Sequence, residues 1–198
     1  MTISQHSEKE RFSYEDYLTW TDDQQWELIN GEPLLMSPAP NRFHQMVSRR
    51  LGYQIEHYLQ DKKTCEVFNS PFDVRLEEAG ISDKNAFNVV QPDLLVVCDH
   101  SKLDNHGCLG APDWIIEIIS PSTASKDHII KRELYERFGV TEYWIVQPMD
   151  RLIMVYQLNP DGRYGKPDVY TEPDVITVGI IPVLQINLKL VFKGIEEI

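Results

Sequence analysis

Two acidic residues stand where the surrounding pattern predicts buried strands. Glu117 interrupts the apolar run 114–119, with two isoleucines on each side, and Asp93 follows Pro92 and opens the apolar run 94–97. A carboxylate in a buried strand is costly unless it is paired, protonated or bound to a metal. The other interpretations are a strand face that reaches solvent or an arginine for Glu117, and a turn or cap for Asp93.

These two carboxylates become one site if their strands are antiparallel neighbours with Asp93 opposite Glu117. That register also sets Val97 opposite Asp113 and leaves 98–112 as a connecting loop. Residues directly opposite have Cβ atoms about 4.5–5.5 Å apart. Two carboxylates that close repel each other unless they share a proton or a divalent cation. Carboxylate oxygens suit Mg²⁺ or Mn²⁺, so we expect one of these cations as cofactor.

A lysine follows Glu117 on the next predicted helix, 126–138. Lys131 lies four residues after Asp127, and only the short turn 120–125 separates this helix from the Glu117 strand. Because the first turns of the helix must lie over the end of that strand, Lys131 can reach a metal site and a substrate phosphate. The alternative is a surface ion pair between Asp127 and Lys131 on a solvated face.

The rest of the chain predicts an α/β domain with a mixed sheet. The stripe of Ile130, Leu134 and Phe138 predicts the core face of the 126–138 helix, with Lys131 beside it. Asn30-Gly31 supplies the two positive φ angles of a type I′ turn. Beyond these we expect helices at 13–20 and 41–60, a β-hairpin over 26–36, and strands at 72–76, 89–97, 114–119, 152–158, 175–178, 188–192 and from 142 onward.

Composition and charge set broad limits on function. The chain has 198 residues, of which 42% are hydrophobic and 25% charged, as in a globular protein with a single core. Its 31 acidic and 19 basic residues give a net charge of −12. That balance argues against a protein that coats nucleic acid, but it leaves room for a local basic cleft.

Cysteine usage and hydropathy indicate a cytoplasmic protein without a membrane partner. The three cysteines, Cys65, Cys98 and Cys108, contain no C-x-x-C pair, so we expect buried thiols rather than a disulfide framework or a zinc knuckle. The N-terminus lacks the apolar segment of a signal peptide, and no apolar run is long enough to cross a bilayer.

The order Pro92-Asp93, then Glu117 in an apolar strand, resembles the PD-(D/E)XK nuclease superfamily, which has the restriction-endonuclease-like fold. One branch of it, bacterial restriction-endonuclease-like proteins of unknown function, is similar over a longer string. That string contains Glu117-Ile-Ile-Ser-Pro-Ser-Thr123, Asp127, Lys131, Tyr135, Gly139-Val140 and Glu142-Tyr-Trp144. The resemblance implies one domain, 1–198, with a core at about 14–192. We expect a mixed sheet flanked by helices, with extra strands at both ends.

The same resemblance implies the roles of the central residues. Asp93 and Glu117 would be catalytic and would bind the metal together with the backbone carbonyl of Ile118. The superfamily expects a lysine two positions after Glu117, where this chain has Ile119. The similar branch places its lysine on the following helix, so that catalytic role is carried to Lys131.

Three further residues are weaker candidates. Glu27 interrupts the first hairpin, and the resembled fold often draws another acid from its N-terminal elements; an outward-facing strand residue is the alternative. His44 stands in the first turn of the long helix, where a cap or a surface imidazole is the alternative. Gln91 directly precedes Pro92 and could touch substrate.

The predicted function is a metal-dependent endonuclease that hydrolyses phosphodiester bonds of DNA. Two alternatives stay open: a non-catalytic binding or regulatory module on this fold, and a metal-dependent hydrolase of a small phosphorylated substrate. DNA affinity depends on phosphate neutralisation, so an acidic protein must concentrate its cations. A homodimer would align two sets of the candidate cations, which are Arg49-Arg50, Lys62-Lys63, Lys131-Arg132 and Arg137.

Overall fold

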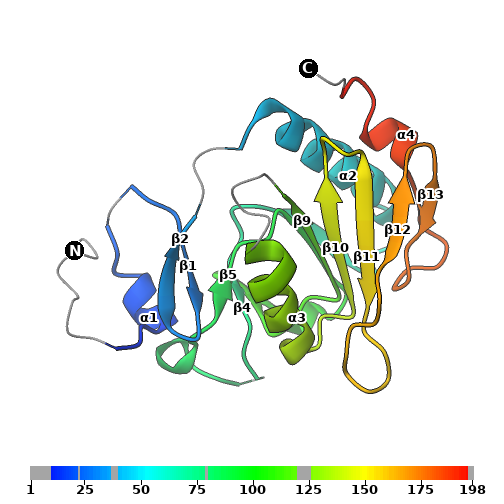
Figure 1. Ribbon diagram of the computed structural model, residues 1–198. Helices are drawn as coiled ribbons and strands as arrows, with labels where there is room; N and C mark the ends of the chain where they lie inside the picture. The colour runs from blue at the N-terminus through cyan, green and yellow to red at the C-terminus, as the bar shows by residue number, and fades with distance from the viewer. Residues whose placement is uncertain (1–9, 22, 37–39, 79, 120–125, 196–198) are drawn as a thin grey trace.

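The chain folds into two six-stranded mixed sheets, a two-stranded sheet and the helices that cover them (Figure 1). The structure is a computed structural model, and it describes residues 10–21, 23–36, 40–78, 80–119 and 126–195. The α/β class and the mixed sheet expected from the sequence are confirmed.

The first sheet has the order β2-β1-β5-β4-β8-β7 and the second the order β12-β11-β10-β9-β6-β3. The first sheet contains β1 (Trp26–Ile29), β2 (Glu32–Leu35), β4 (Val74–Arg75), β5 (Val89–Val90), β7 (Leu103–Asp104) and β8 (Gly107–Leu109). The second contains β3 (Glu66–Asn69), β6 (Leu94–Val97), β9 (Trp114–Ile118), β10 (Glu142–Gln147), β11 (Leu152–Gln157) and β12 (Asp168–Thr171). The small sheet pairs β13 (Val175–Thr177) with β14 (Gln185–Asn187).

Two helices frame the second sheet, α2 behind it and α3 in front of it in Figure 1. The α-helices are α1 (Tyr14–Tyr17), α2 (Arg42–Leu59), α3 (Arg132–Phe138) and α4 (Leu188–Val191). Short 3-10 turns occupy Asp83–Asn85 and His100–Lys102, and a π-helix, Lys126–Lys131, leads directly into α3. No helix in these described ranges combines the length and the apolar character that a membrane crossing requires.

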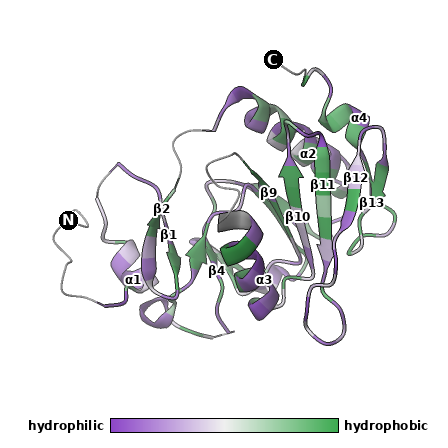
Figure 2. Cartoon of the chain, in the orientation of Figure 1, coloured by the Kyte–Doolittle hydropathy of each residue, from purple (hydrophilic) through white to green (hydrophobic). Residues whose placement is uncertain are grey.

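The strands β9 and β10 are buried on both faces because each is an almost continuous apolar run (Figure 2). They are parallel neighbours, and β9 is also antiparallel to β6. Alternate residues of β9 enter different cores: Ile116 packs with residues of α2 and α4, whereas Ile115 packs with residues of α3. The second sheet therefore lies between α2 and α3, and the ends of β6 and β9 lie between these two helices.

The predicted hairpin over 26–36 is confirmed, with β1 paired to β2. Asn30 and Gly31 have φ angles of 54° and 84°, the two positive values that a type I′ turn needs. A side chain at Gly31 would also come within 3.0 Å of Arg11 Cβ, so the turn packs closely on the preceding segment.

The predicted single strand over 89–97 is wrong, because the chain changes sheets in its middle. β5 belongs to the first sheet and β6 to the second, and Gln91, Pro92 and Asp93 lie between them. Pro92 has no backbone N–H for a ladder and therefore interrupts the strand. The break delivers Gln91 and Asp93 to the junction of the two sheets.

Three other expectations need correction. The 98–112 segment is not a plain loop, since it contains the 3-10 turn at 100–102 and the pair β7–β8. The predicted strand at 188–192 is the short helix α4, which Asn187 caps. The predicted strand at 72–76 shrinks to β4, and its Arg75 is buried because Asp83 and Asp104 pair with the guanidinium.

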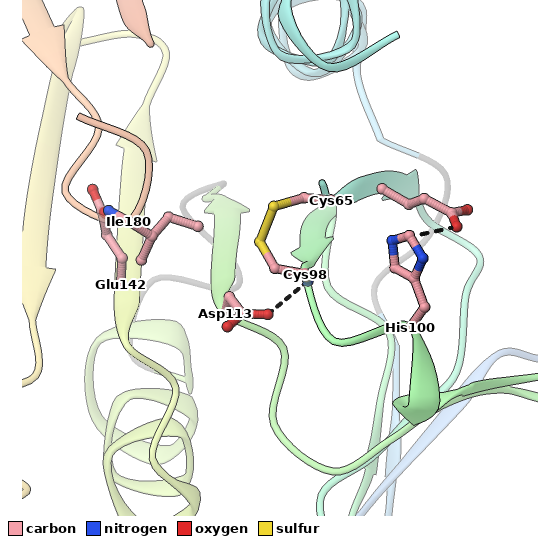
Figure 3. The surroundings of a disulfide bond; sticks show 7 residues. Cys65, Cys98, His100, Asp113, Glu142 and Ile180 are labelled. Carbon is pink, nitrogen blue, oxygen red and sulfur yellow. Dashed lines mark hydrogen bonds and ion pairs between the residues drawn. A yellow bond between two sulfur atoms is a disulfide. The ribbon is translucent and has the colours of Figure 1, made fainter. Parts of the chain in front are cut away.

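Two of the cysteines form a disulfide, so the expectation of free thiols at all three positions is wrong. Figure 3 shows the Cys65–Cys98 bond. The β3–β6 register pairs Glu66 with Val97, and one further step along the two strands places Cys65 opposite Cys98. The 33-residue separation in sequence gave no sign of this pairing, because the register of an edge strand creates it. Cys108 remains a buried free thiol.

Candidate active site

The two carboxylates identified from the sequence lie at neighbouring strand ends, in the register expected for them. β6 pairs antiparallel to β9 with Leu94 opposite Ile116. Continuing this register by one residue places Asp93 opposite Glu117. The sheet therefore brings both acids to one end of the β6–β9 pair, beside the junction with the first sheet.

Glu117 is held in a buried ionic cluster with a lysine and a second glutamate. Lys131 Nζ lies 2.8 Å from Glu117 Oε1 and 2.8 Å from Glu27 Oε1. The exposed fractions are 0% for Glu27, 4% for Glu117 and 4% for Lys131. A buried carboxylate is costly without a partner, and the single ammonium of Lys131 is the ion-pair partner that both share. Glu27 is therefore an inward residue of β1, and the outward alternative for it is wrong.

A phenol also contacts Glu117. Tyr135, which is fully buried on α3, donates its O–H to Glu117 Oε1 at 2.7 Å. Burial, together with the negative charge of Glu117, raises the pKa of Tyr135 well above its ordinary value. The phenol therefore stays a hydrogen-bond donor at neutral pH.

The π-helix before α3 decides which residues of this segment face the sheet. The expected core position Ile130 is 42% exposed, whereas Lys131 is buried. The prediction that Ile130 is a core residue assumed α-helical spacing, and it is wrong. A π turn holds more residues than an α turn, and this difference rotates the side chains that follow. The side chain of Asp127 and the turn 120–125 lie outside the described residues.

Asp93 is anchored by a different set of partners. Its Oδ2 accepts the backbone N–H of Ile118 at 2.7 Å, and its Oδ1 lies 3.1 Å from His44 Nε2. Asn41 caps α2, so His44 in the first turn is directed to the end of β6 by the helix start. The Asp93 carbonyl also accepts the N–H of Ser70, which ties it to β3.

Gln91 connects this site to a second polar group under α1. Its backbone N–H donates to Glu27 Oε1 at 3.1 Å, and its Nε2 donates to Asp73 Oδ1 at 2.7 Å and to the Tyr17 hydroxyl at 3.1 Å. Tyr14 also donates its hydroxyl to Asp73. The amide oxygen of Gln91 is buried without a hydrogen-bond partner among the described residues.

The oxygen-rich donor set fits a hard divalent cation held by few protein ligands. Within the described ranges no three side chains of His, Cys, Asp or Glu are grouped as a metal cage. Mg²⁺ commonly takes one or two carboxylates and completes its shell with water and substrate phosphate. The β6–β9 register brings two carboxylates, those of Asp93 and Glu117, to one sheet end, whereas most zinc sites are built from nitrogen and sulfur ligands.

Basic side chains gather along the outer face of α3. A groove of about 710 Å³ there has Arg132, Arg137 and Arg163 in its lining, together with Glu133 and Glu136. Of the other cations expected to meet DNA, Arg50 instead donates to backbone carbonyls near the end of α4. Arg132 and Arg137 are on α3, whereas Arg163 lies in the segment between β11 and β12 and pairs with Glu136.

A mixed sheet with helices on both faces and acidic residues at neighbouring strand ends is typical of the restriction-endonuclease-like class of fold. The crystal structure of a protein from Anabaena variabilis, described as a "putative nuclease belonging to DUF820", superposes with a TM-score of 0.73. The superposition covers 93% of this chain and 99% of that one at 18% sequence identity, which makes it evidence of fold. The family model Uma2, described as "Putative restriction endonuclease", matches residues 14–189, and the chain belongs to that family.

The chain is also similar in sequence to a protein whose description states no activity. It is an uncharacterized protein of Synechocystis sp., 28% identical over 157 residues that span 78% of each chain.

Sequence reasoning gave Tyr135 no role of its own, and it overlooked Asp73. The signal for Tyr135 is its spacing, since it lies four residues after Lys131 and therefore follows it on one helix face. Asp73 carried no comparable signal, because it sits in an alternating segment that reads as a strand with one wet face.

Proposed function

We propose that this protein is a divalent-cation-dependent endonuclease that hydrolyses phosphodiester bonds of DNA. The observation that carries the proposal is the buried Glu27–Lys131–Glu117 cluster at the same sheet end as Asp93. A cluster of buried charges at a strand end is costly for a fold that needs only stability, and such arrangements gather at functional sites.

The chain's own residues divide into ligands and positioning groups. Asp93, Glu117 and the Ile118 carbonyl would hold Mg²⁺ or Mn²⁺, which when bound supplies charge neutralisation and an activated water. Lys131 carries the ammonium that can donate to a phosphate oxygen or to the attacking water. His44 and the Ile118 N–H hold Asp93 in place, and Glu27 holds Lys131.

DNA as substrate is supported by the family and by the arginines along α3. A net charge of −12 opposes nucleic-acid binding at long range, so contact depends on local cations and on the bound metal. Arg132, Arg137 and Arg163 supply such cations in the groove that α3 lines. We therefore expect binding that weakens steeply with salt and strengthens with Mg²⁺.

The test is cleavage of supercoiled plasmid by the purified protein with Mg²⁺ or Mn²⁺. We expect nicking or cutting by the wild type and none by Asp93→Asn or Glu117→Gln. Asp113→Asn is the matched control, because Asp113 lies at the opposite end of the same strands and accepts the Cys98 N–H (Figure 3). Cleavage that persists in both site variants would overturn the assignment.

Turnover of a small phosphorylated compound without any action on DNA would favour the alternative function, a metal-dependent hydrolase of a small phosphorylated substrate. An absence of divalent-cation binding would favour a non-catalytic module.

A further inference from the structure

Two donors share one oxygen of Glu117, and they differ in what else they can do. Lys131 and Tyr135 both donate to Oε1, at 2.8 and 2.7 Å. Lys131 also contacts Glu27, so it has a second carboxylate to hold it if it leaves Glu117. Among the described residues, the one acceptor of the Tyr135 hydroxyl is Glu117.

The two donors also differ in charge. The Lys131 ammonium occupies space beside Glu117 as a cation, and a divalent metal on the same carboxylate would compete with it electrostatically. A neutral phenol does not compete in this way. Its hydrogen bond can persist when a metal is bound, and a ligating carboxylate that is itself hydrogen-bonded is held in one orientation.

We propose that Tyr135 is a positioning residue of the metal site, which fixes the Glu117 carboxylate for the cation. Lys131 is then the exchangeable donor, which turns from Glu117 toward the substrate phosphate while it remains anchored by Glu27. This inference rests on the proposed metal site and adds a division of labour between two side chains on one helix face.

The packing of Tyr135 fits this role. The ring is fully buried and packs edge-on against Tyr143 of β10, with ring centroids 5.0 Å apart. A ring fixed in this way loses little entropy when its hydroxyl is placed, so the phenol is preorganised toward Glu117. The substitution Tyr135→Phe keeps the ring and removes only the donor.

The experiment is calorimetric titration of the full chain with Mn²⁺ alone, without DNA. We expect Tyr135→Phe to weaken Mn²⁺ binding about 10- to 100-fold, the usual cost of losing a group that orients a metal ligand. Tyr164→Phe is the matched control, since Tyr164 is another buried tyrosine whose hydroxyl donates to the Val140 carbonyl. It should bind Mn²⁺ as the wild type does.

Each outcome has a defined meaning. Wild-type binding with an unchanged affinity in Tyr135→Phe would overturn this inference and leave the proposed function standing. No Mn²⁺ binding by the wild type would overturn both.

A second measurement guards against a folding defect. The thermal unfolding of the wild type, Glu117→Gln, Tyr135→Phe and the double variant is measured with and without Mn²⁺. We expect Mn²⁺ to raise the Tm of the wild type most. It should raise the Tm of Tyr135→Phe less. Equal Mn²⁺-induced shifts in the wild type and Tyr135→Phe would contradict the positioning role.

Discussion

Glu117 and Glu142 are two buried carboxylates on neighbouring parallel strands, and their surroundings differ. Glu117 on β9 is 4% exposed and receives an ammonium and a phenol. Glu142 on β10 is 1% exposed and receives neutral donors: the Trp144 indole N–H at 2.7 Å and the Ile180 N–H at 2.9 Å. Figure 3 places Glu142 against Ile180 of the C-terminal region.

The difference teaches that burial of an acid does not by itself indicate chemistry. Glu142 ties the segment after β13 to the sheet, which is a structural task that fixed donors can fulfil. Glu117 shares the buried ammonium of Lys131 with another acid, Glu27, and stands opposite Asp93. The partners, rather than the burial, separate a candidate ligand from a structural carboxylate.

The largest expected effect is a difference in Mn²⁺ affinity between variants of Glu117 and of Glu142. Glu117→Gln should lower Mn²⁺ affinity by at least about 100-fold, because it removes a charged ligand rather than a group that only orients one. Glu142→Gln should leave the affinity within a factor of about two, since sites without shared partners act independently. Calorimetric titration of both variants measures this, and equal losses would erase the distinction between the two acids.

A second prediction concerns the Cys65–Cys98 disulfide, which, like Glu142, lies away from the candidate site. Cys65→Ser should lower the free energy of unfolding by about 3–4 kcal/mol, the chain-entropy effect of opening a loop of this size. Denaturant unfolding, with reduced wild type for comparison, checks it. Mn²⁺ affinity should be retained.

The third cysteine provides the control for that experiment. Burial raises the pKa of the Cys108 thiol to about 12, so it should resist alkylation in the native protein at neutral pH. Cys108→Ser should leave the response to reductant unchanged. A wild type whose free energy of unfolding does not change on reduction would show that the bond does not form in solution.

A third prediction tests the ammonium beside Glu117. Lys131→Met should raise Mn²⁺ affinity about tenfold, because the competing cation is removed from two carboxylates. The same variant should lose DNA cleavage, because no donor remains for the phosphate or the water. Titration and plasmid cleavage measure the two effects, and a loss of Mn²⁺ binding would contradict the exchangeable role of Lys131.

The smallest expected effect is the pH dependence that Glu142 imposes on stability. Burial raises the folded-state pKa of Glu142 above its ordinary value of 4.5. Between those two values the folded chain binds more protons than the unfolded chain, so this group's contribution falls as the pH rises. Denaturant unfolding across this range should give a shallower decline in Glu142→Gln, and parallel pH profiles would refute the assignment.

The position of the acids could be predicted from the sequence because it depends on local pattern. The apolar neighbours of Glu117 and the run after Asp93 indicate two buried strands, and one antiparallel register brings the acids together. The Asn30-Gly31 turn and the Asn41-capped helix α2 follow from equally local rules. These elements appear in the structure where the pattern placed them.

What could not be predicted depends on tertiary structure. Pro92 marks a break, yet only the assembled sheets show that the chain crosses between them there. The π-helix that buries Lys131 has no signature in an α-helical stripe. The Cys65–Cys98 pair depends on the register of β3, and the Glu27 contact depends on how the first sheet packs against α3.

The most direct test of the metal site is a crystal structure of the protein soaked in Mn²⁺, with anomalous difference density measured. We expect one strong peak at the end of β6 and β9, in contact with a carboxylate oxygen of Asp93 and of Glu117. A saturating soak without a peak there, or with Mn²⁺ bound only elsewhere, would contradict it.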